Sequence, residues 1–138
     1  MSDRSRRWWA VAAVVLHAVV VLIHGAAHDK LEIGLSPAGN VFVIVVILIS
    51  PPIAGGLLLL PYARAGAWLL AASMVGSLAF GGYNHYVAMS PDHVTQTPDT
   101  TWGMVFRVTA ALLVVTELLG LAAAANVLRR ESLAAPGS

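Results

Sequence analysis

Residues 8–27 read WWAVAAVVLHAVVVLIHGAA, a run in which histidine is the only strongly polar residue type. A bilayer core of about 30 Å is crossed by roughly 20 helical residues, so this run is long enough to span a membrane. Three comparable apolar runs follow, at residues 38–60, 65–87 and 103–128. The sequence therefore predicts an all-α integral membrane protein with four transmembrane helices. Because three more spans follow the first run, we interpret it as a retained helix and not as a cleaved signal peptide.

The composition agrees with this interpretation and excludes several function classes. Of the 138 residues, 58% are hydrophobic and 11% are charged, whereas soluble domains carry about 25% charged residues. A formal net charge of +1, with no basic patch, argues against a nucleic-acid partner. The sequence has no glycine-rich phosphate loop, which argues against a nucleotide. It also has no cysteine, which excludes disulfides, iron–sulfur clusters and thiol catalysis.

The basic residues predict the orientation in the membrane. Lys30 and Arg107 fall on one side of the predicted spans, and the other six basic residues fall on the opposite side: Arg4, Arg6, Arg7, Arg64, Arg129 and Arg130. Since cytoplasmic loops are enriched in Lys and Arg, we expect both termini in the cytoplasm of a bacterial-type inner (plasma) membrane. The short connection between the second and third runs predicts antiparallel neighbours, and hence an up-down-up-down four-helix bundle. Residues 1–138 would form this single domain, with residues 129–138 as a cytoplasmic tail.

Three histidines lie on one stripe of the first predicted helix. At about 100° per residue, the side chains of His17, His24 and His28 point within about 40° of one another. His24 and His28 are four residues apart, so their imidazoles can project side by side toward one point. Neutral imidazole is a common ligand of Zn, Cu, Fe and Ni. The alternative is that polar residues simply collect on the few inward faces of a small bundle.

Two more histidines are expected at the same outer end. His85 closes the third predicted helix and His93 lies in the loop that follows it. The first and third helices both run outward, so His24, His28, His85 and His93 are candidate metal ligands. As an alternative, His85 and His93 are interfacial residues at the headgroup level, where aromatic side chains also gather.

Four charged residues near this end could support the ligands or hold an anion. The carboxylates of Asp29, Glu32 and Asp92 could accept hydrogen bonds from imidazole N–H groups. Arg107 lies one turn inside the fourth helix, where it could hold a protein carboxylate, a substrate anion or a haem propionate, or extend toward the surface.

A second polar layer is predicted near mid-membrane. Glu117 lies inside the fourth span, where an unpaired ionisable group costs several kcal/mol. Counting about 1.5 Å per residue places His17, Ser50, Ser73 and Glu117 at similar depths. We expect Glu117 to approach His17, directly or through water. The layer could lock the bundle through hydrogen bonds or relay protons.

Two adjacent prolines interrupt the second span. Pro51 and Pro52 remove the helical hydrogen bonds to the carbonyls of Ile47 and Leu48 and predict a kink. Carbonyls in a bilayer need another donor, and the hydroxyl of Ser50 is the nearest candidate.

The sequence favours a metal site and does not specify a reaction. The first hypothesis is a site for Cu, Zn or non-haem Fe, used in redox chemistry or metal handling. Met89 and Met104 near the outer end would suit Cu(I). In a haem b variant, His85 and one histidine of the first helix would be the axial ligands.

Two other functions stay open. The chain could be a non-catalytic accessory or assembly subunit of a larger membrane complex, or it could act as a homo-oligomeric, proton-coupled transporter that uses His17 and Glu117. No motif identifies catalytic residues or shows that the protein is an enzyme.

Overall fold

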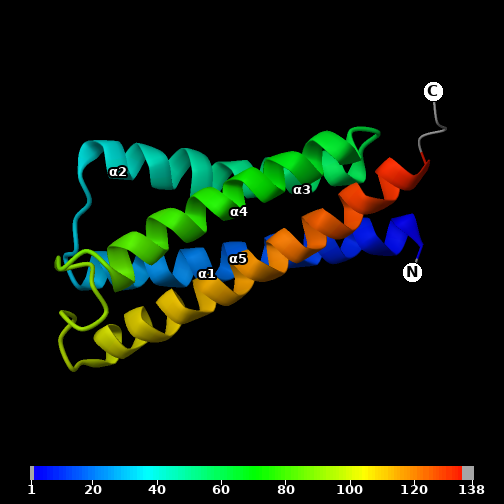
Figure 1. Cartoon of the computed structure of the whole chain (residues 1–138). Coiled ribbons are helices and arrows are strands. Elements are labelled where there is room, and N and C mark those ends of the chain that lie inside the picture. Colours follow the sequence, from blue (N-terminus) through cyan, green and yellow to red (C-terminus); the bar gives the residue numbers. More distant parts are fainter. Residues whose placement is uncertain (1, 135–138) are drawn as a thin grey trace.

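The computed structural model describes residues 2–134, and these form helices joined by loops, without a strand. The elements in order are α1 (Asp3–Lys30), α2 (Pro37–Phe42), η1 (Val43–Ile49), α3 (Ser50–Leu59), α4 (Ala63–Tyr86) and α5 (Thr101–Ala134). Since α2, η1 and α3 are continuous, four helical segments are long and apolar enough to cross a membrane. Figure 1 shows the start of α1 and the end of α5 at one end of the molecule, with the links between α1 and α2 and between α4 and α5 at the other.

The helices extend beyond the predicted apolar runs. α1 begins at Asp3, where the Ser2 side chain accepts a hydrogen bond from the Ser5 backbone N–H and caps the helix. α5 continues to Ala134, so the predicted tail at residues 129–138 is helical as far as that residue, and residues 135–138 lie outside the described part. Hydropathy marks where a helix meets lipid, but a helix can continue into water on polar residues.

α1 and α5 pack antiparallel in a register marked by two hydrogen bonds. The Nδ1 atom of His17 lies 3.1 Å from Thr116 Oγ1, and Nδ1 of His24 lies 2.8 Å from Thr109 Oγ1. The two histidines are seven residues apart, and so are the two threonines. This spacing keeps the same faces of two packed helices together. Ala10 and Ala27 of α1 and Ala124 of α5 are fully buried, and such small residues allow close approach of neighbouring helices.

The apolar core lies in the half of the bundle near the chain's start. Its buried members come from all four spans: Ala10, Val14, Ala54, Leu58, Ala67, Leu70, Met74, Ala124 and Val127. Gly66 permits a close approach between α3 and α4, because a Cβ there would lie 2.8 Å from the Ala54 carbonyl oxygen. The opposite half of the bundle is where most buried polar side chains gather.

The second span contains a π-helical segment directly before the two prolines. In η1 the turns are wide, and both the backbone N–H and the hydroxyl of Ser50 donate to the Val45 carbonyl, the hydroxyl at 2.7 Å. The Ser50 hydroxyl therefore donates to a backbone carbonyl, as predicted, but that carbonyl belongs to Val45 and not to Ile47 or Leu48. π-turns are frequent where the regular helical ladder is disturbed.

Candidate metal centre

Three histidines meet at the end of the bundle away from the chain's start. His24 and His28 lie one turn apart near the end of α1, and His85 lies in the last turn of α4. One ligand nitrogen of each ring lies within 4.8 Å of those of the other two. His24 and His85 are buried and His28 is partly buried. The i, i+4 pair of α1 and the predicted partner from α4 thus come together in one group, here called the histidine triad (His24, His28 and His85).

The hydrogen bonds of Thr109 assign the proton on His24. The Thr109 hydroxyl donates to the Val105 carbonyl at 2.7 Å, so its oxygen accepts the bond from His24 Nδ1 at 2.8 Å. A neutral imidazole carries a single N–H. His24 therefore holds its proton on Nδ1 and leaves the lone pair of Nε2 free.

Backbone carbonyls assign the other two rings in the same way. The Nδ1 atom of His85 lies 3.0 Å from the Asp92 carbonyl oxygen, and Nδ1 of His28 lies 3.2 Å from the Ile33 carbonyl oxygen. Because a carbonyl oxygen only accepts, both rings donate from Nδ1. In neutral rings the Nε2 atoms then carry the lone pairs that can bind a cation, and the Nδ1–H bonds hold the rings in orientation, as hydrogen-bonded partners do in metal sites.

The free nitrogens of His24 and His85 face each other. Their Nε2 atoms lie 3.2 Å apart, which is hydrogen-bond distance. When one of the two carries a proton it donates to the other, and when neither does their lone pairs repel. A proton or a metal ion between them removes the repulsion. An ion bound tetrahedrally at about 2.0–2.1 Å from each nitrogen separates two of them by about 3.3 Å, which matches this one pair; the three nitrogens together lie only within 4.8 Å of one another, so the rings would draw closer around a bound ion.

Asp92 places a carboxylate beside the triad. Its Oδ1 lies 3.2 Å from His28 Nε2 and 3.2 Å from His85 Nδ1, although neither contact has hydrogen-bond geometry. Burial works to raise the pKa of Asp92, but the contact with His85, together with the attraction of the three nearby histidines whenever they are protonated, outweighs it and holds that pKa below its ordinary value. Asp92 is therefore a carboxylate that can neutralise part of a bound cation's charge.

An aromatic ring from α5 closes the side of the triad. Phe106 is fully buried, and its centroid lies 4.7 Å from that of His24, 5.1 Å from His28 and 5.3 Å from His85. Neither Phe106 nor Thr109 was predicted as part of the site. The signal for Thr109 is its seven-residue spacing from Thr116, which matches the spacing of His17 and His24.

The triad opens on its other side into a cavity of about 490 Å³. The walls come from α1, η1, α4, α5 and the link after α1, and they are mainly apolar. A metal ion held by three histidines would therefore keep a coordination position facing the cavity, as metal sites that bind exchangeable ligands do.

Several residues predicted for this end lie outside the triad. The Nδ1 atom of His93 lies 2.9 Å from Thr95 Oγ1, and His93 is not brought together with the three ligand rings. Arg107 forms an ion pair with Asp99 at 3.1 Å, the protein-carboxylate alternative. Within the described chain, Asp29 and Glu32 are exposed and pair with no histidine. Met89 and Met104 are also exposed and give copper no added support.

The predicted mid-membrane layer does not form as one hydrogen-bonded group. His17 bonds to Thr116, Ser73 to the Leu70 carbonyl and Ser50 to the Val45 carbonyl. The structure describes no direct hydrogen bond between Glu117 and His17, because Thr116 takes the position beside His17 Nδ1 and Glu117 lines the cavity; an approach through water stays a prediction. Successive residues on a helix differ by about 100°, which separates the two side chains.

The arrangement of the rings favours a compact ion over haem. Axial haem ligands approach iron from opposite faces of a macrocycle, whereas the rings of His24 and His85 touch edge to face with centroids 4.8 Å apart. The chain matches no protein-family model, no curated protein and no solved structure.

Proposed function

We propose that this protein is a multi-pass membrane protein that binds a first-row transition metal ion through His24, His28 and His85. The observation that carries the proposal is the convergence of three ligand nitrogens within 4.8 Å, with each Nδ1 facing another hydrogen-bond partner. Three imidazoles form a donor set that suits Zn²⁺, Cu²⁺ and Fe²⁺. Asp92 would stabilise the bound cation by its charge.

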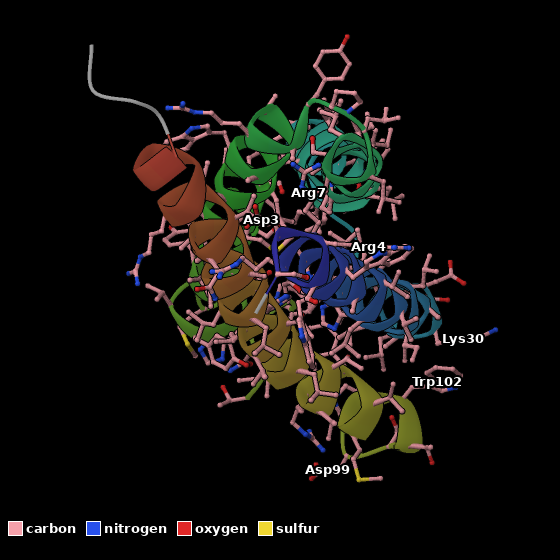
Figure 2. The ribbon with its side chains drawn as sticks, turned by 90° about the vertical axis from the view of Figure 1, so that its right-hand side faces the viewer. Asp3, Arg4, Arg7, Lys30, Asp99 and Trp102 are labelled. Carbon is pink, nitrogen blue, oxygen red and sulfur yellow. The ribbon has the colours of Figure 1, made fainter. Side chains whose placement is uncertain are left out.

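We further propose that the site faces the outside of an inner (plasma) membrane. The basis is the excess of arginines at the end that carries the chain's start, which the positive-inside tendency assigns to the cytoplasm. Figure 2 shows Arg4 and Arg7 at that end, with Lys30 and Asp99 extending away from the helices elsewhere. In this orientation the four spans run up-down-up-down, with both termini cytoplasmic, and the triad receives metal from the extracytoplasmic side.

The chemistry that the site supports is metal handling or metal-centred redox chemistry. Three neutral ligands and one nearby carboxylate hold a divalent ion without neutralising it fully, and the cavity side leaves room for an exchangeable ligand. A bound metal would supply Lewis acidity, and with Cu or Fe also electron transfer. The residues of the chain would orient the imidazoles and exclude bulk water through Phe106 and the apolar cavity walls.

Metal titration of the purified protein tests the proposal. The protein in detergent is stripped with a chelator, then titrated with Zn²⁺ and with Co²⁺, whose visible absorption reports tetrahedral nitrogen coordination. We expect one equivalent to bind. His24→Ala and His85→Ala should each lower the affinity at least a hundredfold, because each removes one of three ligands. His93→Ala is the matched control and should bind as the parent does, since His93 lies outside the triad.

Two results would overturn the proposal. One is a parent protein that neither retains a metal on purification nor binds Zn²⁺, Cu²⁺ or Fe²⁺. The other is an equal affinity in the parent, His24→Ala and His85→Ala proteins. Either result would favour the accessory-subunit alternative, which native purification followed by mass spectrometry of co-purifying chains would then test.

A further inference from the structure

The deep end of the cavity carries two polar side chains that the metal site does not use. Glu117 of α5 is 3% exposed and Ser77 of α4 is fully buried, and both line the cavity. Within the described residues, the Ser77 hydroxyl has no hydrogen-bond partner and no hydrogen bond reaches the Glu117 carboxyl. Buried polar groups in a bilayer normally find partners, so these two point to something that occupies the cavity.

The two groups lie at the same depth. Ser77 precedes His85 by eight residues along α4, and Glu117 follows Thr109 by eight residues along α5. By helix rise, both therefore lie about 12 Å farther into the bundle than the triad. The cavity thus has a polar upper end at the triad, a polar deep end at Ser77 and Glu117, and apolar walls between them that include Ile47, Phe80 and Leu113.

The mouth of the cavity reaches the lipid-facing surface. Leu22 of α1 and Leu48 of η1 both line the cavity and are 63% and 39% exposed. Gly25 also lines it, is exposed, and has open space where a side chain would project. The cavity therefore borders the surface between α1 and η1, which is where a molecule dissolved in the bilayer would enter. Ionised molecules are strongly disfavoured in the hydrocarbon region, so the ligand that arrives this way is neutral.

We infer that the cavity binds a neutral, lipid-soluble hydroxyl compound of the phenol type, whose hydroxyl donates to the Glu117 carboxyl and accepts from Ser77. A carboxyl oxygen accepts a hydrogen bond whether or not the group is ionised, and a hydroxyl both donates and accepts. The ring lies against Phe80 and the aliphatic walls. The volume of about 490 Å³ falls within the range of small-molecule sites. This inference needs no bound metal and stands independently of the proposed function.

The test compares 4-propylphenol with its methyl ether, 4-propylanisole. The full chain is placed in lipid nanodiscs, and saturable binding is measured by equilibrium dialysis against empty nanodiscs, with and without chelator. We expect one equivalent of the phenol to bind, about tenfold more tightly than the ether, the difference that one ordinary hydrogen bond makes. Chelator should not change this ratio. Glu117→Leu should abolish the preference for the phenol, and Ser77→Ala should weaken the binding of both compounds, because the oxygen of either one can accept from Ser77.

A matched pair of glycine variants tests the location without altering the polar groups. Gly25→Leu fills the mouth and should remove saturable binding of both compounds. Gly56→Leu also projects into open space, but Gly56 is not a cavity residue, so this variant should bind as the parent does. Thermal unfolding of each variant in detergent reports whether the bundle is intact, and this measurement does not depend on metal binding.

The inference is overturned if the phenol shows no saturable binding, if phenol and ether bind equally to the parent, or if Gly25→Leu binds as well as Gly56→Leu. A protein that binds Zn²⁺ normally and fails these tests retains the proposed metal function without the cavity ligand. If Glu117→Leu does not fold, the Ser77→Ala and Gly25→Leu results decide.

Discussion

His17 and Thr116 repeat, one layer deeper in the bundle, the hydrogen bond that His24 makes to Thr109. The Nδ1-to-Oγ1 distances are 3.1 Å and 2.8 Å, respectively. The two histidines differ in the surroundings of their second ring nitrogen, Nε2. The Nε2 atom of His17 is buried without a hydrogen-bond partner among the described residues, whereas that of His24 faces His85 at 3.2 Å. One pair therefore lies in the helix interface alone, and the other also belongs to the proposed metal site.

This repetition provides a matched pair of substitutions. Thr109→Val removes the acceptor that holds the proton on His24 Nδ1, and we expect Zn²⁺ affinity to fall about 10–100-fold, as it does when a ligand's hydrogen-bond partner is lost. Thr116→Val removes the same group beside His17 and should leave the affinity unchanged. Competition with a chelating dye measures both. Equal affinities in the two variants would show that Thr109 does not orient a ligand.

Removing the charge of Asp92 should weaken metal binding. Asp92→Asn keeps the size of the side chain, and its backbone carbonyl still accepts from His85 Nδ1. The negative charge 3.2 Å from His28 and His85 is lost. We expect an affinity loss of about 10–100-fold. Asp99→Asn is the control, because Asp99 pairs with Arg107, and it should bind metal as the parent does.

Metal binding should weaken as the pH falls. Ligation needs an imidazole nitrogen without a proton, so protons compete increasingly with the metal as the pH falls. The Asp92 carboxyl does not contribute to this loss, because its pKa lies below its ordinary value of 3.8 and it stays ionised through the range. Zn²⁺ titrations at several values between pH 5 and pH 8 measure the effect. An affinity independent of pH over this range would contradict imidazole ligation.

The α3–α4 contact gives a prediction about stability. Gly66→Ala places a methyl group 2.8 Å from the Ala54 carbonyl oxygen and 2.9 Å from Leu57 Cβ, so the helices must separate. We expect a loss of about 1–3 kcal/mol in the free energy of unfolding. Gly56→Ala meets open space and should be neutral or slightly stabilising, since alanine favours a helix. Thermal unfolding in detergent compares the two variants.

The spans could be predicted because they depend on the length of each apolar run. The triad could be predicted because it depends on residue spacing along α1 and on which helix ends lie together. Hydropathy gave the four spans within a few residues, and the i, i+4 spacing of His24 and His28 placed two rings side by side. The rotation of α5 could not be predicted in this way. Depth counting put Glu117 level with His17, but it is Thr116, about 100° away on the helix, that contacts His17.

Backbone adaptation was also beyond sequence reasoning. Pro51 and Pro52 indicate that the helical ladder is interrupted, but not which carbonyl receives a substitute donor. In the structure the helix adapts before the prolines: the turns of η1 are wide, and the Ser50 hydroxyl donates to the Val45 carbonyl. His93 illustrates a different limit, because its position in a loop permitted a place in the cluster, while the local turn directs its Nδ1 to Thr95.

The two carboxyl groups that line the cavity, Asp92 and Glu117, set its electrical balance. Three neutral imidazoles add no charge, so a divalent ion is neutralised when both carboxyls are ionised. A monovalent ion reaches the same balance only when one of them carries a proton. Since an unbalanced charge in a low-dielectric interior is costly, a divalent ion bound at the proposed site would favour the ionised form of both carboxyls.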